Sequence, residues 1–96
     1  MFLILLRYQR PVDEVDAVRP QHVEFLDRGF AEGRYVLAGR CIPPEGGVLV
    51  ARGTGVEEVR RLAEADPYVQ KGIAEYELVQ FHAGRTEPGL VGDEEM

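Results

Sequence analysis

The sequence predicts a small α+β domain in which two helices cover one face of an antiparallel four-stranded sheet. Two observations support this fold class. Short runs rich in branched and aromatic residues, which favour strands, alternate with two longer stretches whose apolar residues recur every three or four positions, which favours helices. The 96 residues are 45% hydrophobic and 29% charged, a composition typical of one globular domain with a modest core.

The first strand is expected over residues 2–8, because Phe2 to Leu6 are all apolar. A polar link leads to the first helix. Proline is tolerated only in the first turn of a regular helix, so Pro20 predicts that this helix begins near Arg19. We expect it to end near Gly33, since glycine is the usual residue after a helix. Its inner stripe recurs at steps of three and four: Val15, Val18, His22, Leu26 and Gly29.

Two strands are predicted next, over residues 35–41 and 47–52. The intervening Pro43-Pro44-Glu45-Gly46-Gly47 is a turn. Both strands are short and rich in apolar residues, as expected for strands that pack against a helical layer.

The second helix is predicted to begin at Thr54 as its N-cap and to end at Asp66, where Pro67 stops it. A short turn then leads to a last strand over residues 73–82. Residues 83–96 contain glycines, a proline and several acids, and we expect an acidic C-terminal tail outside a domain of residues 1–82.

The predicted order, strand–helix–strand–strand–helix–strand, is that of the ferredoxin-like βαββαβ fold. The strands are apolar on both faces: Leu3 and Leu5 alternate with Phe2 and Ile4. An antiparallel sheet with one solvated face should instead alternate apolar with polar residues. We therefore expect a homodimer in which a partner covers the second sheet face, a dimeric α/β barrel-type assembly. The alternative is that runs this short do not report which face is buried.

Charge and cysteine content exclude several function classes. With 11 basic and 17 acidic side chains, the net charge of −6 argues against nucleic acid or an anionic membrane as a partner. The lone cysteine, Cys41, cannot form an internal disulfide and fits a reducing cytoplasm. The apolar run at residues 1–6 is too short for a membrane span and has no basic segment before it, so we expect a strand and no signal peptide.

Two acid–base side chains, His22 and Asp66, carry most of the functional information. His22 falls in an otherwise apolar helical stripe, and a buried imidazole is costly unless it is hydrogen-bonded, most strongly by a carboxylate. If folding brings Asp66 to His22, the chain has a proton-handling site. Otherwise His22 is a core histidine bonded to a backbone carbonyl, and Asp66 is a turn former.

Three motifs resemble the YciI-like (YCII-related) family over residues 1–82: Arg19-Pro20-x-His22 leading into a helix, Ala38-Gly39, and Ala65-Asp66-Pro67-Tyr68 with Gly72 four residues on. The resemblance implies a small dimeric α+β protein with a pocket centred on a histidine and an aspartate, here His22 and Asp66. Some relatives resemble isomerases or dehydrochlorinating enzymes of aromatic degradation. The family often has proline after the Ala-Gly pair, where this chain has Arg40.

The resemblance implies a general acid/base role for His22, oriented by Asp66, in lyase, isomerase or dehydrochlorinase chemistry. We expect Arg19 to hold a substrate carboxylate and Tyr68 to close the apolar wall of the pocket. Gly39 and Arg40 are expected at its rim. Arg19 could equally be a solvated residue at the helix start, and Tyr68 a core residue.

No cofactor or metal is expected, because two histidines 60 residues apart with scattered carboxylates do not make a ligand set. Cys41 is expected to be an inert half-buried thiol and His82 a surface imidazole. Two hypotheses follow. The chain is a small metal-independent enzyme acting on an anionic organic metabolite, or it is a non-catalytic dimeric binding or accessory module that uses the same pocket.

Overall fold

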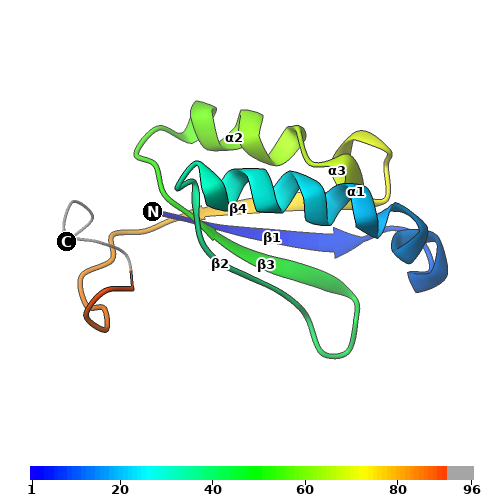
Figure 1. Cartoon of the computed structure of the whole chain (residues 1–96), viewed down its shortest axis with the longest axis horizontal. Helices are drawn as coiled ribbons and strands as arrows, with labels where there is room; N and C mark the ends of the chain where they lie inside the picture. Colours follow the sequence, from blue (N-terminus) through cyan, green and yellow to red (C-terminus); the bar gives the residue numbers. More distant parts are fainter. Residues whose placement is uncertain (91–96) are drawn as a thin grey trace.

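The computed structural model describes residues 1–90 as two layers, a sheet with all its helices on one side (Figure 1). The tail predicted over residues 83–96 therefore lies partly outside the described residues. The elements run in the order β1 (Phe2–Tyr8), α1 (Val12–Ala31), β2 (Tyr35–Arg40), β3 (Gly46–Ala51), α2 (Val56–Glu64), α3 (Pro67–Gln70) and β4 (Ala74–Gln80).

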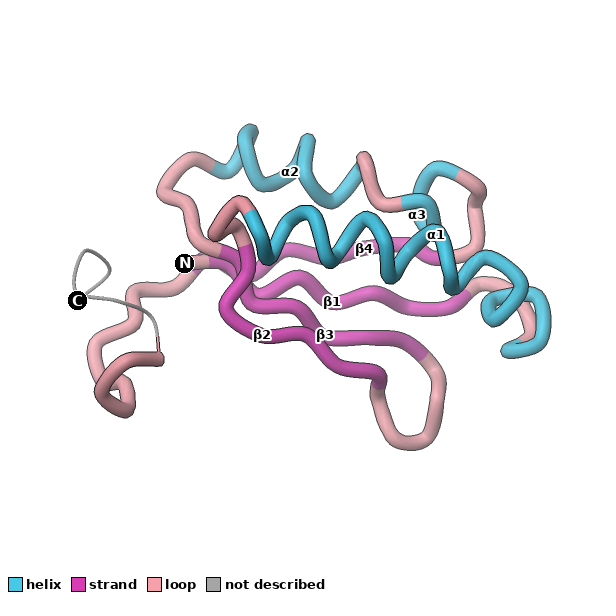
Figure 2. Tube along the Cα trace, in the orientation of Figure 1, coloured by secondary structure: helices cyan, strands magenta, loops and turns pink. Residues whose placement is uncertain are grey.

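The sheet has four strands in the order β2-β3-β1-β4, and every neighbouring pair is antiparallel. This confirms the predicted α+β fold with the ferredoxin-like element order. The two central strands, β1 and β3, are the most apolar segments of the chain, as a position between two neighbours favours. The tube in Figure 2 shows the connection between β2 and β3 extending away from both layers.

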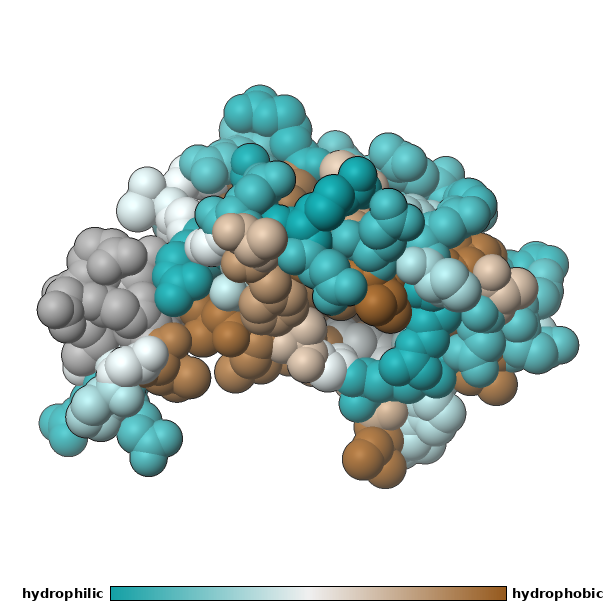
Figure 3. Space-filling view, in the orientation of Figure 1, coloured by the Kyte–Doolittle hydropathy of each residue, from teal (hydrophilic) through white to brown (hydrophobic). Residues whose placement is uncertain are grey.

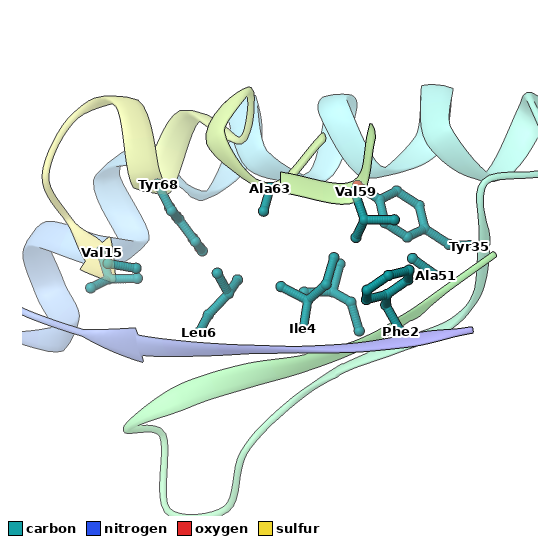
Figure 4. Close-up of a cluster of buried hydrophobic side chains, with 11 residues drawn as sticks. Phe2, Ile4, Leu6, Val15, Tyr35, Ala51, Val59, Ala63 and Tyr68 are labelled. Carbon is teal, nitrogen blue, oxygen red and sulfur yellow. The ribbon is translucent and has the colours of Figure 1, made fainter. Parts of the chain in front are cut away.

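The core lies between the sheet and the helices (Figure 4). From β1, Phe2, Ile4 and Leu6 point toward the helical layer, because alternate side chains of a strand share one face. Val59 of α2 and Tyr68 of α3 reach down to meet them. Burying each large apolar side chain contributes roughly 1.5–3 kcal/mol. The packing of the helices on the sheet therefore stabilises the fold.

The expected start of the first helix was wrong. α1 begins at Val12, and Pro20 lies in its interior. Figure 1 shows the first turns of α1 lying at an angle to the rest of the helix, which is the usual consequence of an interior proline. The early turns are held because Val15 is completely buried among core residues. Its burial offsets the hydrogen bond that Pro20 cannot make.

The second helical region differs from the prediction at both ends. The N-cap of α2 is Gly55 and not Thr54, and no side chain caps this helix. At the other end Pro67 does not merely stop α2: it begins the one-turn helix α3, with Asp66 as the N-cap. A proline at the first position of a helix loses nothing, because that N–H has no partner inside the helix. The helical layer therefore holds three helices among the described residues, not two.

The other sheet face has no helix over it (Figure 1). Apolar side chains of all four strands lie on it, and Leu37 and Val79 are 44% exposed. In the space-filling view, hydrophobic residues gather along the lower edge, below the mostly hydrophilic helical layer (Figure 3). At one end Ala83 is buried against Met1, so the start of the expected tail packs on the domain. No helix within residues 1–90 is long and apolar enough to cross a membrane.

Candidate functional site

A cavity of about 170 Å³ lies between the helical layer and the ends of three strands. Every residue that the sequence assigned to the site except Asp66 lines it directly, and Asp66 is buried behind His22. The lining combines apolar side chains with a few polar ones: Leu6, Tyr8, Arg19, His22, Val23, Leu26, Ala38, Gly39, Arg40, Gly47, Val48, Leu49 and Tyr68.

His22 and Asp66 are in direct contact, an arrangement that the residues alone left open and that the family resemblance implied. The His22 Nδ1 atom lies 2.8 Å from Asp66 Oδ1, and the two side chains are 12% and 3% exposed. An ionised carboxylate can only accept, so Nδ1 carries the hydrogen and donates it. The other ring nitrogen, Nε2, is left with a basic lone pair in an imidazole that lines the cavity. This is the geometry that a general base requires.

Asp66 is placed by the junction between α2 and α3. α2 ends at Glu64, and Asp66 adopts an extended backbone before Pro67 starts α3. Its Oδ1 accepts the backbone N–H of Tyr68 at 2.9 Å as well as the imidazole N–H. Asp66 therefore both caps α3 and orients His22. The fold fixes the positions of the two donors that its carboxylate oxygen accepts from.

Tyr68 is both a core residue and a wall of the cavity, so the two alternatives weighed for it are both realised. Its ring stacks on the imidazole of His22, with centroids 3.9 Å apart and planes 9° from parallel. Burial raises the pKa of the Tyr68 hydroxyl to about 12, with a further rise from Tyr8 and an opposing effect of Arg40 and Arg19. The phenol therefore stays neutral at ordinary pH.

Arg40 reaches the cavity because β2 contains an irregularity. The pairing of β2 with β3 shifts between Tyr35 and Leu37. Without the shift, alternation from the buried Tyr35 would turn Arg40 to the open face; with it, Arg40 lies opposite Gly47 on the helix side. Strict alternation from the sequence could not predict this.

The Arg40 guanidinium links strand β2 to helix α1 and to strand β1. It forms an ion pair with Asp16 of α1, and its Nε donates to the Tyr8 hydroxyl at 3.0 Å. These bonds to Asp16 and Tyr8 raise the pKa of Arg40 further above its ordinary value, so it remains a cation. The position after the Ala38-Gly39 pair thus carries a charged side chain that lines the cavity.

Arg19 and Gly39 were expected at the pocket, and both line it. Arg19 is exposed, lies inside α1 and has no ion-pair partner among residues 1–90, so its charge is available to solvent or to a ligand. Gly39 is also exposed, and a methyl group there would meet no atom within 4 Å. The missing side chain of Gly39 leaves space at this position, although packing does not require a glycine there.

Among the residues that the structure describes, Tyr8 is the one polar residue lining the cavity that the sequence did not single out. It is the last residue of β1, on the same strand face as Phe2, Ile4 and Leu6. One signal in the sequence could have identified it. Tyr8 continues the alternating inward face of the strand, and a tyrosine at the end of such a face can place its hydroxyl beside a site. Within residues 1–90 no group of three histidine, cysteine or acidic side chains could hold a metal ion. Cys41 is half-buried and His82 is exposed.

The fold and the site define a ferredoxin-like α+β domain with a His–carboxylate pair at a small cavity. The chain belongs to the family of YCII-related domains, whose family profile matches residues 1–82. It is 35% identical over 60 residues to the uncharacterized protein YjpA of Bacillus subtilis (strain 168), across 62% of this chain and 71% of that protein.

Its fold is also similar to a solved structure of 5-chloro-2-hydroxyhydroquinone dehydrochlorinase (TftG) from Burkholderia phenoliruptrix AC1100, in complex with 2,5-dihydroxybenzoquinone. The TM-score is 0.70 with 17% sequence identity, over 84% of this chain and 93% of that chain. At this identity the likeness is one of fold.

Proposed function

We propose that the chain is a small enzyme in which His22 acts as a general base and acid on a small anionic organic metabolite. The observation that carries the proposal is the 2.8 Å contact of His22 with the buried Asp66 at the wall of a cavity. A histidine that is merely a core residue would not need a carboxylate partner and an open side toward a cavity at the same time.

The chemistry follows from the tautomer. Asp66 holds the hydrogen of Nδ1, so Nε2 can take a proton from a carbon next to a carbonyl and return it at another position or to a leaving group. Asp66 stabilises the imidazolium that forms, because its negative charge lies 2.8 Å away. Such proton transfer contributes about 10²–10⁴-fold in rate. Isomerase, lyase and dehydrochlorinase reactions can all proceed through this step.

The charges at the rim support an anionic substrate. Arg19 and Arg40 line the cavity, and none of the acidic side chains within residues 1–90 lines it. The dehydrochlorinase with the same fold was solved with a quinone that carries two hydroxyl groups, a compact acidic ring. A carboxylate or phenolate of similar size would meet a cation at the mouth and apolar side chains inside.

A homodimer belongs to the same proposal. The open sheet face carries Leu3, Leu5, Val48 and Val50 beside the exposed Leu37 and Val79. A second copy packed on this face through a two-fold axis would remove the apolar surface from water. The opposite face already has its helical cover, so this surface is the one left for a partner.

The second candidate function is a binding module without turnover. The observation that favours it is that two arginines, Arg19 and Arg40, line a small and otherwise largely apolar cavity, which suits holding an anion as well as it suits chemistry. The two functions differ at His22: binding alone does not require a basic nitrogen, whereas turnover does.

Two reactions test the proposal. Chloride release is measured with 5-chloro-2-hydroxyhydroquinone, and exchange of a carbon-bound proton in D₂O is followed by NMR with 2-oxobutanoate. The wild-type protein is compared with His22→Gln, Asp66→Asn and the control His82→Gln, which alters an exposed imidazole far along the chain.

We expect turnover of at least one compound, a loss of about 10²–10⁴-fold in His22→Gln, and no change in His82→Gln. Turnover that survives in His22→Gln would contradict the base assignment. If no form turns over either compound while all of them bind 2,5-dihydroxybenzoquinone equally, the binding module is the function.

A further inference from the structure

The Tyr8 hydroxyl is held at the cavity by a cation. Arg40 Nε donates to it at 3.0 Å, and the guanidinium carbon lies 5.5 Å from the centre of the Tyr8 ring. The Tyr8 backbone is fixed as well, since its N–H donates to the carbonyl of Glu45 at 2.9 Å. Both ends of the residue are therefore positioned by the fold.

This arrangement leaves the hydrogen of the phenol uncommitted. A guanidinium has donors only, so the Tyr8 oxygen must be the acceptor in its bond with Arg40. Within residues 1–90 no group accepts the Tyr8 hydrogen. A hydroxyl that accepts from a cation becomes a stronger donor, because hydrogen bonds in series polarise one another. The Tyr8 O–H group is therefore a hydrogen-bond donor at the cavity wall that is available to a ligand.

We infer that Tyr8 donates this hydrogen to an oxygen of the ligand on which negative charge develops when His22 removes a proton. The inference rests on the proposed function. In that step a C–H bond of the ligand breaks, the hydrogen forms an N–H bond on His22 Nε2, and the electron pair passes through the adjacent C=O to give an enolate oxygen. Tyr8 and the Arg40 charge behind it stabilise this oxygen.

The distances between rings suit one small ligand. Tyr8 packs edge-on against Tyr68, with centroids 5.9 Å apart and planes at 80°, and Tyr68 stacks on His22. The rings of the base and of the donor therefore both contact the ring of Tyr68. Because His22 and Tyr8 also line the same cavity, a base and a proton donor there can act on different atoms of a single compact molecule.

The volume and lining of the cavity define the ligand class. A cavity of about 150 Å³ holds one benzene ring, and this one measures about 170 Å³. Its apolar lining suits a planar carbon body, and Tyr8 and Arg40 suit an anionic oxygen at one edge. The ligand class is therefore a single six-membered ring, or an acid of equal size, with an enol or phenol oxygen conjugated to the reacting carbon.

The test uses 4-nitrophenolate, a one-ring anion whose visible absorbance changes on binding and which offers no C–H for His22 to remove. Tyr8→Phe keeps the ring, the edge-on contact and the cation above it, and deletes only the hydroxyl. The matched control is Tyr76→Phe, because the Tyr76 hydroxyl bonds Glu64 outside the cavity. Neutral 4-nitroanisole serves as the ligand control.

Tyr8→Phe should weaken 4-nitrophenolate binding about 10- to 100-fold, the effect of one hydrogen bond to a charged group. It should leave 4-nitroanisole binding unchanged, and Tyr76→Phe should match the wild-type protein for both. Equal 4-nitrophenolate affinity in Tyr8→Phe and wild type, or no binding to wild type, overturns the inference.

Failure of the proposed function gives a different result. In that case 4-nitrophenolate binding still depends on the Tyr8 hydroxyl, while His22→Gln changes no turnover. Conversely, if turnover is lost in His22→Gln but Tyr8→Phe binds the anion and turns over substrate like wild type, the base assignment stands and the Tyr8 assignment does not.

Discussion

The Tyr68 ring stacks on the His22 imidazole at 3.9 Å between centroids, and the Tyr68 backbone N–H donates to the Asp66 oxygen that accepts from the same imidazole. One residue thus fixes the plane of the histidine with its side chain and the position of the carboxylate with its backbone. The His–Asp pair is therefore built into the core and is not an incidental contact at the surface.

Replacing Tyr68 should test this coupling. Tyr68→Ala deletes a ring that is 2% exposed and leaves a cavity, so we expect the free energy of unfolding in urea to fall by about 3–5 kcal/mol. Tyr68→Phe keeps the stacked ring and should lose much less. As a control, Tyr76→Ala removes a half-buried ring and should cost less than Tyr68→Ala. A loss below about 1 kcal/mol in Tyr68→Ala would contradict the structural role.

Stability should fall at alkaline pH. Burial raises the pKa of Tyr68 to about 12 and raises that of Tyr35 further, whereas tyrosine in an unfolded chain ionises near pH 10. Above pH about 10 the unfolded chain loses protons that the native state keeps, so unfolding becomes easier as pH rises toward 12. The decline is at most about 1.4 kcal/mol per pH unit for each such tyrosine.

The measurement is the free energy of unfolding as a function of pH. Below pH about 10 both states keep the phenol hydrogen, and the curve should be flat with respect to these groups. Tyr68→Phe should show a shallower decline above that point. If its decline is as steep as that of the wild-type protein, Tyr68 ionises freely in the native state and the burial argument fails.

The Asp16–Arg40 ion pair should affect the affinity for an anionic ligand more than it affects the free energy of unfolding. Asp16 is half-exposed, so Asp16→Asn should change the free energy of unfolding by no more than about 1 kcal/mol. Removing its charge leaves Arg40 unneutralised at the mouth, and 4-nitrophenolate should bind roughly twofold to fivefold more tightly at low salt.

Asp13→Asn is the matched control, because Asp13 lies one turn earlier on α1 and does not line the cavity. The difference between the two variants should shrink at high salt, where exposed charges are screened. Weaker binding in Asp16→Asn would mean that the ion pair positions Arg40 and does not compete with the ligand.

The open sheet face gives a prediction about assembly. Leu5 lies on the central strand β1 and points to that face, so Leu5→Lys places a charge where a second copy would pack. The wild-type protein should sediment as a dimer at micromolar concentration and Leu5→Lys as a monomer. Ala31→Lys, at the exposed end of α1, should leave the dimer intact. A monomeric wild-type protein would contradict the assembly.

Much of the fold could be predicted from local sequence patterns. Strand β1 and the stop before Pro67 follow from residue types whose backbone preferences act over a few positions. The start of α1 could not, because the burial of Val15 against distant strands outweighs the local cost of Pro20. The helix α3 was missed because a proline that stops one helix can also begin the next.

The site divides in the same way. His22 and Asp66 could be selected from their places on an apolar stripe and at a helix stop, since both are local features. Arg40 was expected at the rim only through the family resemblance, since it depends on a pairing shift in β2 that alternation does not report. Tyr8 was missed because its significance comes from Arg40, a residue on another strand.

The central claim is that Asp66 fixes His22 with Nε2 as the free basic nitrogen. The most direct test is ¹H–¹⁵N NMR of the His22 ring in ¹⁵N-labelled protein at alkaline pH, with His82 as the internal reference. We predict one tautomer with the hydrogen on Nδ1, and a mixture of both tautomers in Asp66→Ala. A His22 ring with its hydrogen on Nε2 in the wild-type protein would contradict the account.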